Sequence, residues 1–258
     1  MKIQLIRNAT LIIDYAGKKF LLDPFLTDKE TLPPYGPQTG GPDAVRQNQM
    51  NPIFDLPLSV EEIVADIDAI IVTHLHTDHW DEAPHEALPR DIKLFTQNEE
   101  DAAIIRATGF TNVAVLQKDS SFEGIQLGKT KGEHGRGEIL EVTGKVCGVV
   151  FKHESEKTLY IAGDTVWYDA IQTEIETHKP DVIVVNAGAN AFIPSGPIIM
   201  DKEDVYEVYK AAPEATIMAA HMEAVNHWTL SRADLKEFAA EKGISNLLVP
   251  EDGEAYTF

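Results

Sequence analysis

Thr73-His74-Leu75-His76-Thr77-Asp78-His79-Trp80-Asp81 is the stretch around which the rest of this chain is organised. It holds three imidazoles and two carboxylates in nine residues. Directly before it lies the apolar run 69–72, Ala-Ile-Ile-Val, which is typical of a buried strand. Neutral imidazole nitrogen and carboxylate oxygen are both good ligands for Zn²⁺ and similar divalent ions. A buried strand that ends in such a cluster predicts a metal site.

The spacing of these residues suits two metal ions better than one. Residues i and i+2 of an extended segment point the same way, so His74 and His76 can both face one metal. Asp78 and His79 follow where the chain should turn, and they can face a second metal beside the first. A solvated turn is the alternative, but three histidines and an aspartate within six positions are improbable by chance. The strand-then-loop context favours the metal site.

Length, charge and composition limit the class of protein. The 258 residues suit one large α/β domain or two small ones, and no linker divides the chain, so a single domain over 1–258 is expected. A net charge of −20 argues against a large nucleic-acid footprint but not against a small anionic substrate, because bound cations make the site locally positive. The sequence has no apolar run of membrane length and no signal-peptide core, and Cys147 is its single cysteine. We therefore expect a cytoplasmic protein without membrane contact.

Apolar runs and punctuating residues predict alternating strands and helices. Strands are expected at 10–15, 19–23, 69–72, 93–96, 113–116, 158–162, 181–185, 216–220 and 246–250, the last of the chain. Helices are expected at 59–64, 84–88, 98–108, 168–178, 201–211 and 231–242. Glycines at 124, 128, 132, 135, 137 and 144 punctuate residues 120–150, which we therefore expect to form antiparallel strands. Residues 28–58 form a Pro/Gly-rich insertion that contains Tyr35, and we expect it to cover the site; a solvated excursion is the alternative.

Several predicted strands end on or near a metal-ligand type. Asp23, His74, Asp164 and His221 each lie at the end of a separate apolar strand. Ligands of α/β sheets bind beyond the carboxyl ends of the strands. Histidine and aspartate residues at the ends of separate strands would lie together at one edge of the sheet. Such an arrangement on a rigid scaffold is typical of a metal site.

This ordered set resembles the metallo-β-lactamase superfamily. Its hallmark is H-x-H-x-D-H followed by a distant His, Asp and His, which here are His74, His76, Asp78 and His79, then His134, Asp164 and His221. The resemblance covers essentially the whole chain, and the hairpin 3–24 and the length look most like the cytoplasmic branch of L-ascorbate-6-phosphate lactonase-like members. It implies an α/β fold, the αββα four-layer sandwich of the metallo-β-lactamase type.

The resemblance also implies a ligand set. One metal would bind His74, His76 and His134, a second would bind Asp78, His79 and His221, and Asp164 would bridge them. Asp23 would orient a ligand histidine by accepting its free ring N–H. Two divalent ions, Zn or Mn first and Fe as a further option, would hold one hydroxide between them as the nucleophile. Asp78, Asp164 and His227 are the candidate catalytic residues.

Other candidates follow from local context. His221 ends a strand and is preferred as the ligand, whereas His227 lies in the next loop and is expected in the substrate pocket as a hydrogen-bond donor or proton shuttle. Asn186, Arg136, Arg232 and Tyr35 are further candidates for substrate contact. For both arginines, pairing with surface carboxylates of this acidic protein is an equal alternative.

The expected function is metal-dependent hydrolysis of a small soluble metabolite. A lactone or a sugar-phosphate-like ester ranks first, and a small phosphodiester ranks second. A metal-dependent binding or regulatory protein without turnover is the alternative of a different class. The native metal, the exact substrate and the oligomeric state are not determined by these residues, and a homo-oligomer stays open.

Overall fold

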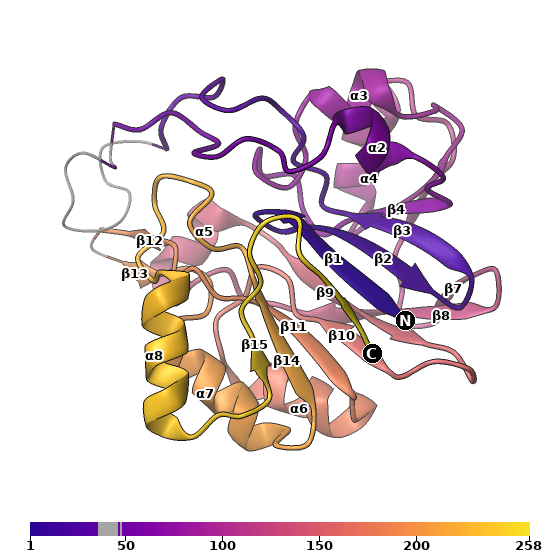
Figure 1. Ribbon diagram of the computed structural model, residues 1–258. Helices are drawn as coiled ribbons and strands as arrows, with labels where there is room; N and C mark the ends of the chain where they lie inside the picture. Colours follow the sequence, from indigo (N-terminus) through magenta and orange to yellow (C-terminus); the bar gives the residue numbers. More distant parts are fainter. Residues whose placement is uncertain (36–45, 47, 194) are drawn as a thin grey trace.

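The computed structural model describes residues 1–35, 46, 48–193 and 195–258, and within them two large sheets dominate (Figure 1). The first sheet contains β1 (Lys2–Arg7), β2 (Thr10–Tyr15), β3 (Lys18–Leu22), β4 (Ala69–Val72), β5 (Lys93–Thr96), β6 (Val113–Val115) and β16 (Ala255–Thr257). Its order is β16-β1-β2-β3-β4-β5-β6. Pairing is antiparallel from β16 to β3 and parallel from β3 to β6.

The second sheet repeats this division into an antiparallel and a parallel half. It contains β7 (Ser120–Phe122), β8 (Ile125–Lys131), β9 (Cys147–Lys152), β10 (Leu159–Ile161), β11 (Val182–Asn186), β14 (Thr216–Ala220) and β15 (Leu247–Leu248). The order is β15-β14-β11-β10-β9-β8-β7, antiparallel from β7 to β10 and parallel from β10 to β15. A short hairpin, β12 (Ala191–Phe192) with β13 (Gly196–Pro197), lies outside both sheets.

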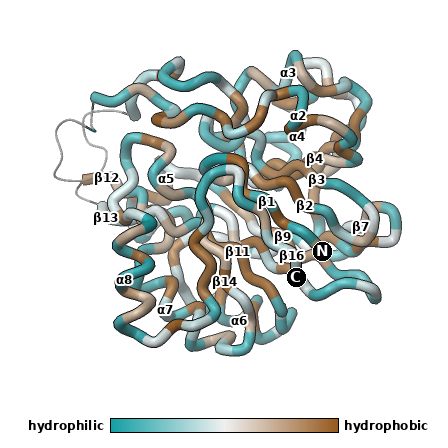
Figure 2. The backbone as a smooth tube through the Cα atoms, in the orientation of Figure 1, coloured by the Kyte–Doolittle hydropathy of each residue, from teal (hydrophilic) through white to brown (hydrophobic). Residues whose placement is uncertain are grey.

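Helices cover the outer face of each sheet. The first sheet packs against α2 (Val60–Val64), α3 (Ala83–Ala87) and α4 (Glu99–Ala107), and the second against α6 (Asp169–His178), α7 (Lys202–Ala211) and α8 (Arg232–Lys242) (Figure 1). The hydrophobic colour of Figure 2 follows strands such as β1 and β14, while much of the outer helices is hydrophilic. This is the αββα sandwich that the sequence predicts.

Strand β4 shows why a fully apolar run suits this architecture. Ala69 and Ile71 face the core between the sheets, and Ile70 and Val72 face the core under the helices. Successive side chains of a strand point to opposite faces, and here both faces are covered. The chain therefore needs no polar residue until Thr73, where the strand ends at the edge of the sandwich.

Two of the predicted boundaries are wrong. The strand expected at 246–250 is not the last, because β16 follows it and pairs antiparallel with β1. Ladder hydrogen bonds to an edge strand hold β16, which has no apolar pattern to reveal it. Within 120–150, residues 137–143 form a 3₁₀ turn (Gly137–Ile139) and α5 (Leu140–Thr143) instead of strand. The glycines there end helical turns, as Gly144 does with φ 74°.

The Pro/Gly-rich segment 28–58 is described only in part. Its residues 36–45 and 47 lie outside the described residues, and so does the central part of the cover that we expected. Before the gap, Leu32 pairs with Asn51 through two backbone hydrogen bonds of 2.8 Å. After it, the Arg46 guanidinium stacks 3.9 Å from the Trp228 ring centroid and donates to the Trp228 carbonyl. The described flanks are thus joined to the loop that follows β14. Among the described residues, no helix is both long and apolar enough to cross a membrane.

Candidate metal centre

Four histidine rings converge on one carboxylate oxygen. The Nε2 atoms of His79, His134, His221 and His74 lie 3.2, 3.5, 3.7 and 3.8 Å from Asp164 Oδ2. His74, His134, Asp164 and His221 follow the carboxyl ends of β4, β8, β10 and β14. All of these side chains are buried. Both sheets therefore contribute ligand types to one point at the edge of the sandwich.

The ligand-type atoms form two half-sites joined by Asp164. The structure brings together His74, His76 and His134, which we call the first half-site, and Asp78, His79 and His221, which we call the second half-site. Within each group the ligand atoms lie within 4.8 Å of one another, and a third such group is His74, His79 and Asp164. His227 belongs to none of these groups. The grouping matches the division that the resemblance implies.

Hydrogen bonds on the far side of the rings hold the ligand histidines in place. His79 Nδ1 lies 2.8 Å from Asp23 Oδ2, and His134 Nδ1 lies 2.9 Å from the Ile198 carbonyl. Thr73 Oγ1 lies 3.1 Å from His74 Nδ1. An Nδ1–H that donates to an oxygen leaves Nε2 unprotonated in the neutral ring and available to a metal.

Burial and the neighbouring carboxylates shift the pKa values of the imidazoles in opposite directions, with a different outcome at His74 and His134 than at His79. Burial lowers the pKa of His74 well below its usual value, and it lowers the pKa of His134 to about 4. Burial opposes ionisation of Asp164, but the imidazoles of His79 and His221 hold the pKa of this carboxyl well below its usual range. Burial likewise opposes charge on His79, whereas its carboxylate neighbours, Asp164 first, raise the pKa of the ring.

The donor set fits divalent metal ions. His74 Nε2 is buried and has no hydrogen-bond partner among the described residues, which is costly for a polar atom unless a ligand satisfies it. Four half-site histidines present Nε2 to the same oxygen of Asp164, and each is within reach of a shared ion. A site of imidazole nitrogen and carboxylate oxygen accepts Zn, Mn or Fe.

Asn8, which we did not predict, supports the second half-site. It lies at the turn between β1 and β2, and its Nδ2 is 3.0 Å from the Asp78 carbonyl, 3.3 Å from Asp78 Oδ2 and 3.3 Å from His221 Nε2. Its carbonyl accepts the His221 N–H at 2.7 Å. Asn8 and His221 both have φ 57°, and Asp23 has φ 42°. Left-handed backbone at such residues is costly and is concentrated at functional sites.

We expect Asn8→Ala to weaken metal binding at the second half-site about 10–100-fold, since supporting hydrogen bonds to ligands carry effects of this size. Binding at the first half-site should be unchanged, because Asn8 contacts none of its ligands. Competitive chelator titration, followed by metal analysis of the protein, measures both affinities. Asn112→Ala, at an exposed asparagine, is the matched control. Equal loss at both half-sites would contradict this role for Asn8.

A cavity of about 280 Å³ opens beside the half-sites. Its lining combines ligand types with a largely apolar wall: Tyr35, Leu75, His76, Thr77, Asp78, His134, Asp164, Asn190, Phe192, Ile198 and His227. Tyr35 Oη lies 2.8 Å from Thr77 Oγ1, and the Tyr35 ring packs edge-on against His227 with centroids 5.0 Å apart. Tyr35 and His227 therefore lie where a substrate would bind. Asn190, Phe192 and Ile198 come from the β11–β13 region, where the sequence carries no motif.

The other predicted substrate contacts lie elsewhere. Arg136 binds both oxygens of Asp204, at 2.9 and 3.0 Å, and Arg232 binds Glu223 Oε2, Asp252 and the Pro250 carbonyl. Neither arginine lines the cavity, so both take the role of pairing with carboxylates instead of binding substrate. Asn186 donates to Asp164 Oδ1 at 2.6 Å and so orients the shared carboxylate.

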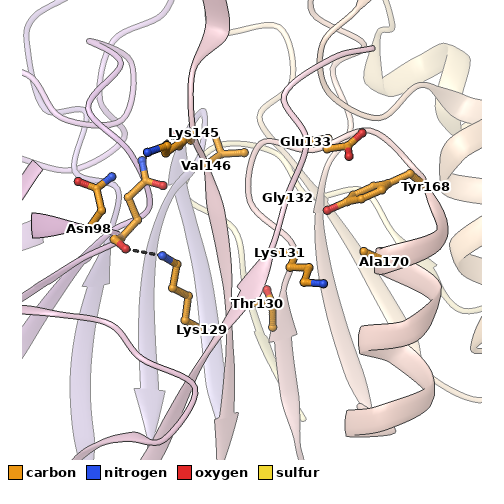
Figure 3. A pocket seen from close by; sticks show the side chains of 11 residues that line it. Asn98, Lys129, Thr130, Lys131, Gly132, Glu133, Lys145, Val146, Tyr168 and Ala170 are labelled. Atoms are coloured by element: carbon orange, nitrogen blue, oxygen red, sulfur yellow. Dashed lines mark hydrogen bonds between the residues drawn. The ribbon is translucent and has the colours of Figure 1, made fainter. Parts of the chain in front are cut away.

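A second cavity, of about 440 Å³, is lined by the last residues of β8 and by three lysines, Lys129, Lys131 and Lys145 (Figure 3). Lys129 donates to the Gln97 carbonyl near Asn98, while the Lys131 side chain is drawn on the opposite side, toward Ala170. The ammonium groups do not converge on one point, and Glu133 also lines the cavity. No anion site is assigned there.

Comparison with known proteins places this geometry among hydrolases. A family model described as a Beta-lactamase superfamily domain matches residues 18–222. The UPF0173 protein YddR of Bacillus subtilis is 58% identical over the full length of both chains. A UPF0173 metal-dependent hydrolase of Xanthobacter autotrophicus is 26% identical and covers 73% of this chain and 72% of its own.

Solved structures show the same similarity. An isothiocyanate hydrolase from Delia radicum gut bacteria is 45% identical with a TM-score of 0.93, and the match covers 100% of this chain and 99% of that one. A possible metal-dependent hydrolase from Veillonella parvula is 35% identical with a TM-score of 0.95, and its match has the same coverage.

Proposed function

Because the chain belongs to the beta-lactamase superfamily and is a metal-dependent hydrolase, we propose that it holds two divalent ions and hydrolyses a small, uncharged electrophile, with an isothiocyanate as the first candidate. The two half-sites joined by Asp164 support the dinuclear centre. The isothiocyanate hydrolase that is 45% identical to this chain supports the substrate class.

The lining of the cavity is the observation that carries this proposal. Among its described residues there is no lysine or arginine, and Leu75, Phe192 and Ile198 form an apolar wall. Two bound cations would attract a phosphate, but no arginine or lysine of the described lining would add to them, so a sugar phosphate or a phosphodiester is less well supported than an uncharged molecule. A lactone is also uncharged, and it remains the second candidate because the same wall and the lactonase-like resemblance accommodate it.

The reaction would be R–N=C=S + H₂O giving R–NH₂ and COS. Water oxygen forms a bond to the central carbon, both protons of the water pass in turn to the nitrogen, and the C–N bond breaks to release the amine and COS. Bound divalent ions would lower the pKa of water and stabilise the negative charge that develops. Asp78 and Asp164 are the carboxylates among the lining residues, and either can accept the proton of the attacking water.

His227 would act on the other side of the reaction, as a hydrogen-bond donor to the nitrogen that becomes protonated. Burial lowers the pKa of its ring to about 4, so the imidazole is neutral at pH 7 and carries one N–H. The apolar wall would bind the substituent R and exclude bulk water, which strengthens every polar interaction inside the cavity. Specificity for the substituent R would then come from the apolar side chains of the cavity wall and not from charged groups at the surface.

We expect the Zn²⁺- or Mn²⁺-loaded protein to hydrolyse benzyl or allyl isothiocyanate with kcat/KM of about 10⁴ M⁻¹s⁻¹ or more, as is usual for an enzyme on its own substrate class. Chelation should abolish the activity, and adding metal back should restore it. Loss of isothiocyanate absorbance and release of COS measure the rate. A lactone series and bis(p-nitrophenyl) phosphate, assayed in parallel, test the other classes.

The panel separates the candidates. Preference for lactones would replace the first candidate by the second, and preference for the phosphodiester would overturn the argument from the uncharged cavity. A metal-loaded protein that turns over no member of the panel would favour the non-catalytic metal-dependent binding protein.

A further inference from the structure

The hydrogen bonds of His227 define which of its nitrogens carries the proton. His227 Nε2 lies 3.3 Å from Asn190 Nδ2, and both side chains are buried in the lining of the cavity. An amide nitrogen only donates hydrogen bonds, so with the Asn190 amide in this orientation, which leaves its Oδ1 buried without a partner among the described residues, His227 Nε2 accepts the bond and is unprotonated. In a neutral ring the single proton is then on Nδ1.

The Nδ1–H of His227 lacks an acceptor in the protein. His227 Nδ1 is buried and has no hydrogen-bond partner among the residues that the structure describes. A buried donor without an acceptor costs free energy, and native proteins seldom leave one without a reason. Since the ring lines the cavity, a molecule bound there is the partner that can satisfy the donor.

Backbone hydrogen bonds hold the Asn190 and His227 side chains beside each other. The Ala191 N–H donates to the His227 carbonyl at 3.1 Å, and the Ile198 N–H donates to the Asn190 carbonyl at 2.7 Å. A Cβ on Gly188 would come within 2.5 Å of Asn190 Oδ1, so the absence of a side chain there leaves room for the amide. Phe192 packs on the other side of the His227 ring, with centroids 5.8 Å apart.

We propose that Asn190 is a positioning residue that fixes the Nδ1–H tautomer of His227, so that this N–H is presented to the heteroatom of the substrate that becomes protonated. For an isothiocyanate that atom is the nitrogen, and for a lactone it is the ring oxygen that leaves. The catalytic part of this inference rests on the proposed hydrolase function, whereas the tautomer itself does not.

Histidine tautomers can be read directly by NMR. In ¹⁵N-labelled, Zn²⁺-loaded protein at pH 7, two-bond ¹H–¹⁵N spectra should show His227 with a protonated Nδ1 and an unprotonated Nε2. Loss of one set of ring signals in His227→Gln assigns them. In Asn190→Asp a carboxylate acceptor faces Nε2, and the proton should move to that nitrogen. Phe192→Leu, which removes a ring contact but not the hydrogen bond, should keep the Nδ1–H tautomer.

Kinetics then test the consequence for turnover. Asn190→Asp and Asn190→Ala should lower kcat at least about 10-fold, a part of the usual contribution of one positioned hydrogen-bond donor, while metal content and KM stay close to the unchanged protein. An Nε2–H tautomer in the unchanged protein, or an Asn190→Asp variant that keeps the Nδ1–H tautomer, would overturn the inference. The NMR result stands whichever substrate class proves correct, so it can fail independently of the proposed function.

Discussion

Replacing Asp164 by asparagine is expected to lower kcat about 1,000-fold or more, which corresponds to about 4 kcal/mol of lost transition-state stabilisation. Asp164 Oδ2 is the atom on which the Nε2 atoms of His79, His134 and His221 converge. An amide in this place offers a neutral group whose NH₂ cannot bind a metal, so the charge that holds two cations together is removed. Both half-sites should therefore lose metal.

The fold should survive this substitution. Asn186 donates to Asp164 Oδ1 at 2.6 Å, and the carbonyl oxygen of an asparagine can still accept that bond. Metal content per chain and kcat are the measurements, with circular dichroism of the metal-free protein as the check on folding. Asp119→Asn, at an exposed aspartate, is the matched control and should change neither. An Asp164→Asn variant that keeps its full metal content would show that this carboxylate is not needed to hold the metal ions.

Asp23→Ala is expected to reduce both stability and metal affinity. Asp23 Oδ1 accepts the Thr73 N–H at 2.7 Å, and Oδ2 accepts the Thr73 hydroxyl at 2.7 Å and lies 2.8 Å from His79 Nδ1. Alanine would leave three buried donors without an acceptor, which should lower the free energy of unfolding by about 3–5 kcal/mol. Loss of the carboxylate that orients His79 should weaken metal binding at the second half-site about 10–100-fold.

Denaturant unfolding of the metal-free protein separates the two effects of Asp23→Ala, because no metal contributes to that free energy. Asp68→Asn serves as the control, since Asp68 pairs with Lys18 at the surface at 3.1 Å and should contribute at most about 1 kcal/mol. Asp23→Asn keeps the shape but places an amide N–H against donors, so it should resemble alanine in its effect on metal. An Asp23→Ala variant with unchanged unfolding and unchanged metal affinity would show that the three hydrogen bonds carry no weight.

Part of the proposed ligand set could be predicted because its residues are tied to a local pattern, whereas His134 was placed only by its order in the chain and the family resemblance. His74 and His76 follow an apolar strand at a spacing of two, and Asp164 follows the apolar run that ends at Ala162. Such runs form strands whatever they pair with, and their carboxyl ends then meet at one edge. The helix predicted at 59–64 also depends on neighbouring residues alone, because Ser59 caps its start and forms a capping box with Glu62. The fold class followed from the same regular alternation.

Contacts between distant segments could not be predicted in this way. Asn8 reaches Asp78 and His221 across 70 and 213 positions, and no pattern near Asn8 marks it. Arg136 and Arg232 looked suited to an anionic substrate by residue type alone. Which carboxylate an arginine meets depends on packing, and here Arg136 pairs with Asp204 and Arg232 with Glu223, outside the cavity lining.

The motif Thr73–Asp81 and the strand-end residues determined by themselves that this chain carries a histidine- and aspartate-lined metal site on an α/β scaffold, because ligand spacing and apolar periodicity are local properties of a sequence. The αββα sandwich followed from the family resemblance that these residues carry. The tertiary structure alone decided what surrounds that centre. It placed Phe192, Ile198 and Asn190 around His227, left the cavity lining without a lysine or arginine among the described residues, and gave His227 its hydrogen-bond partner. These features arise where the β11–β13 region meets the loop after β14, so they depend on which segments pack together and not on any one of them.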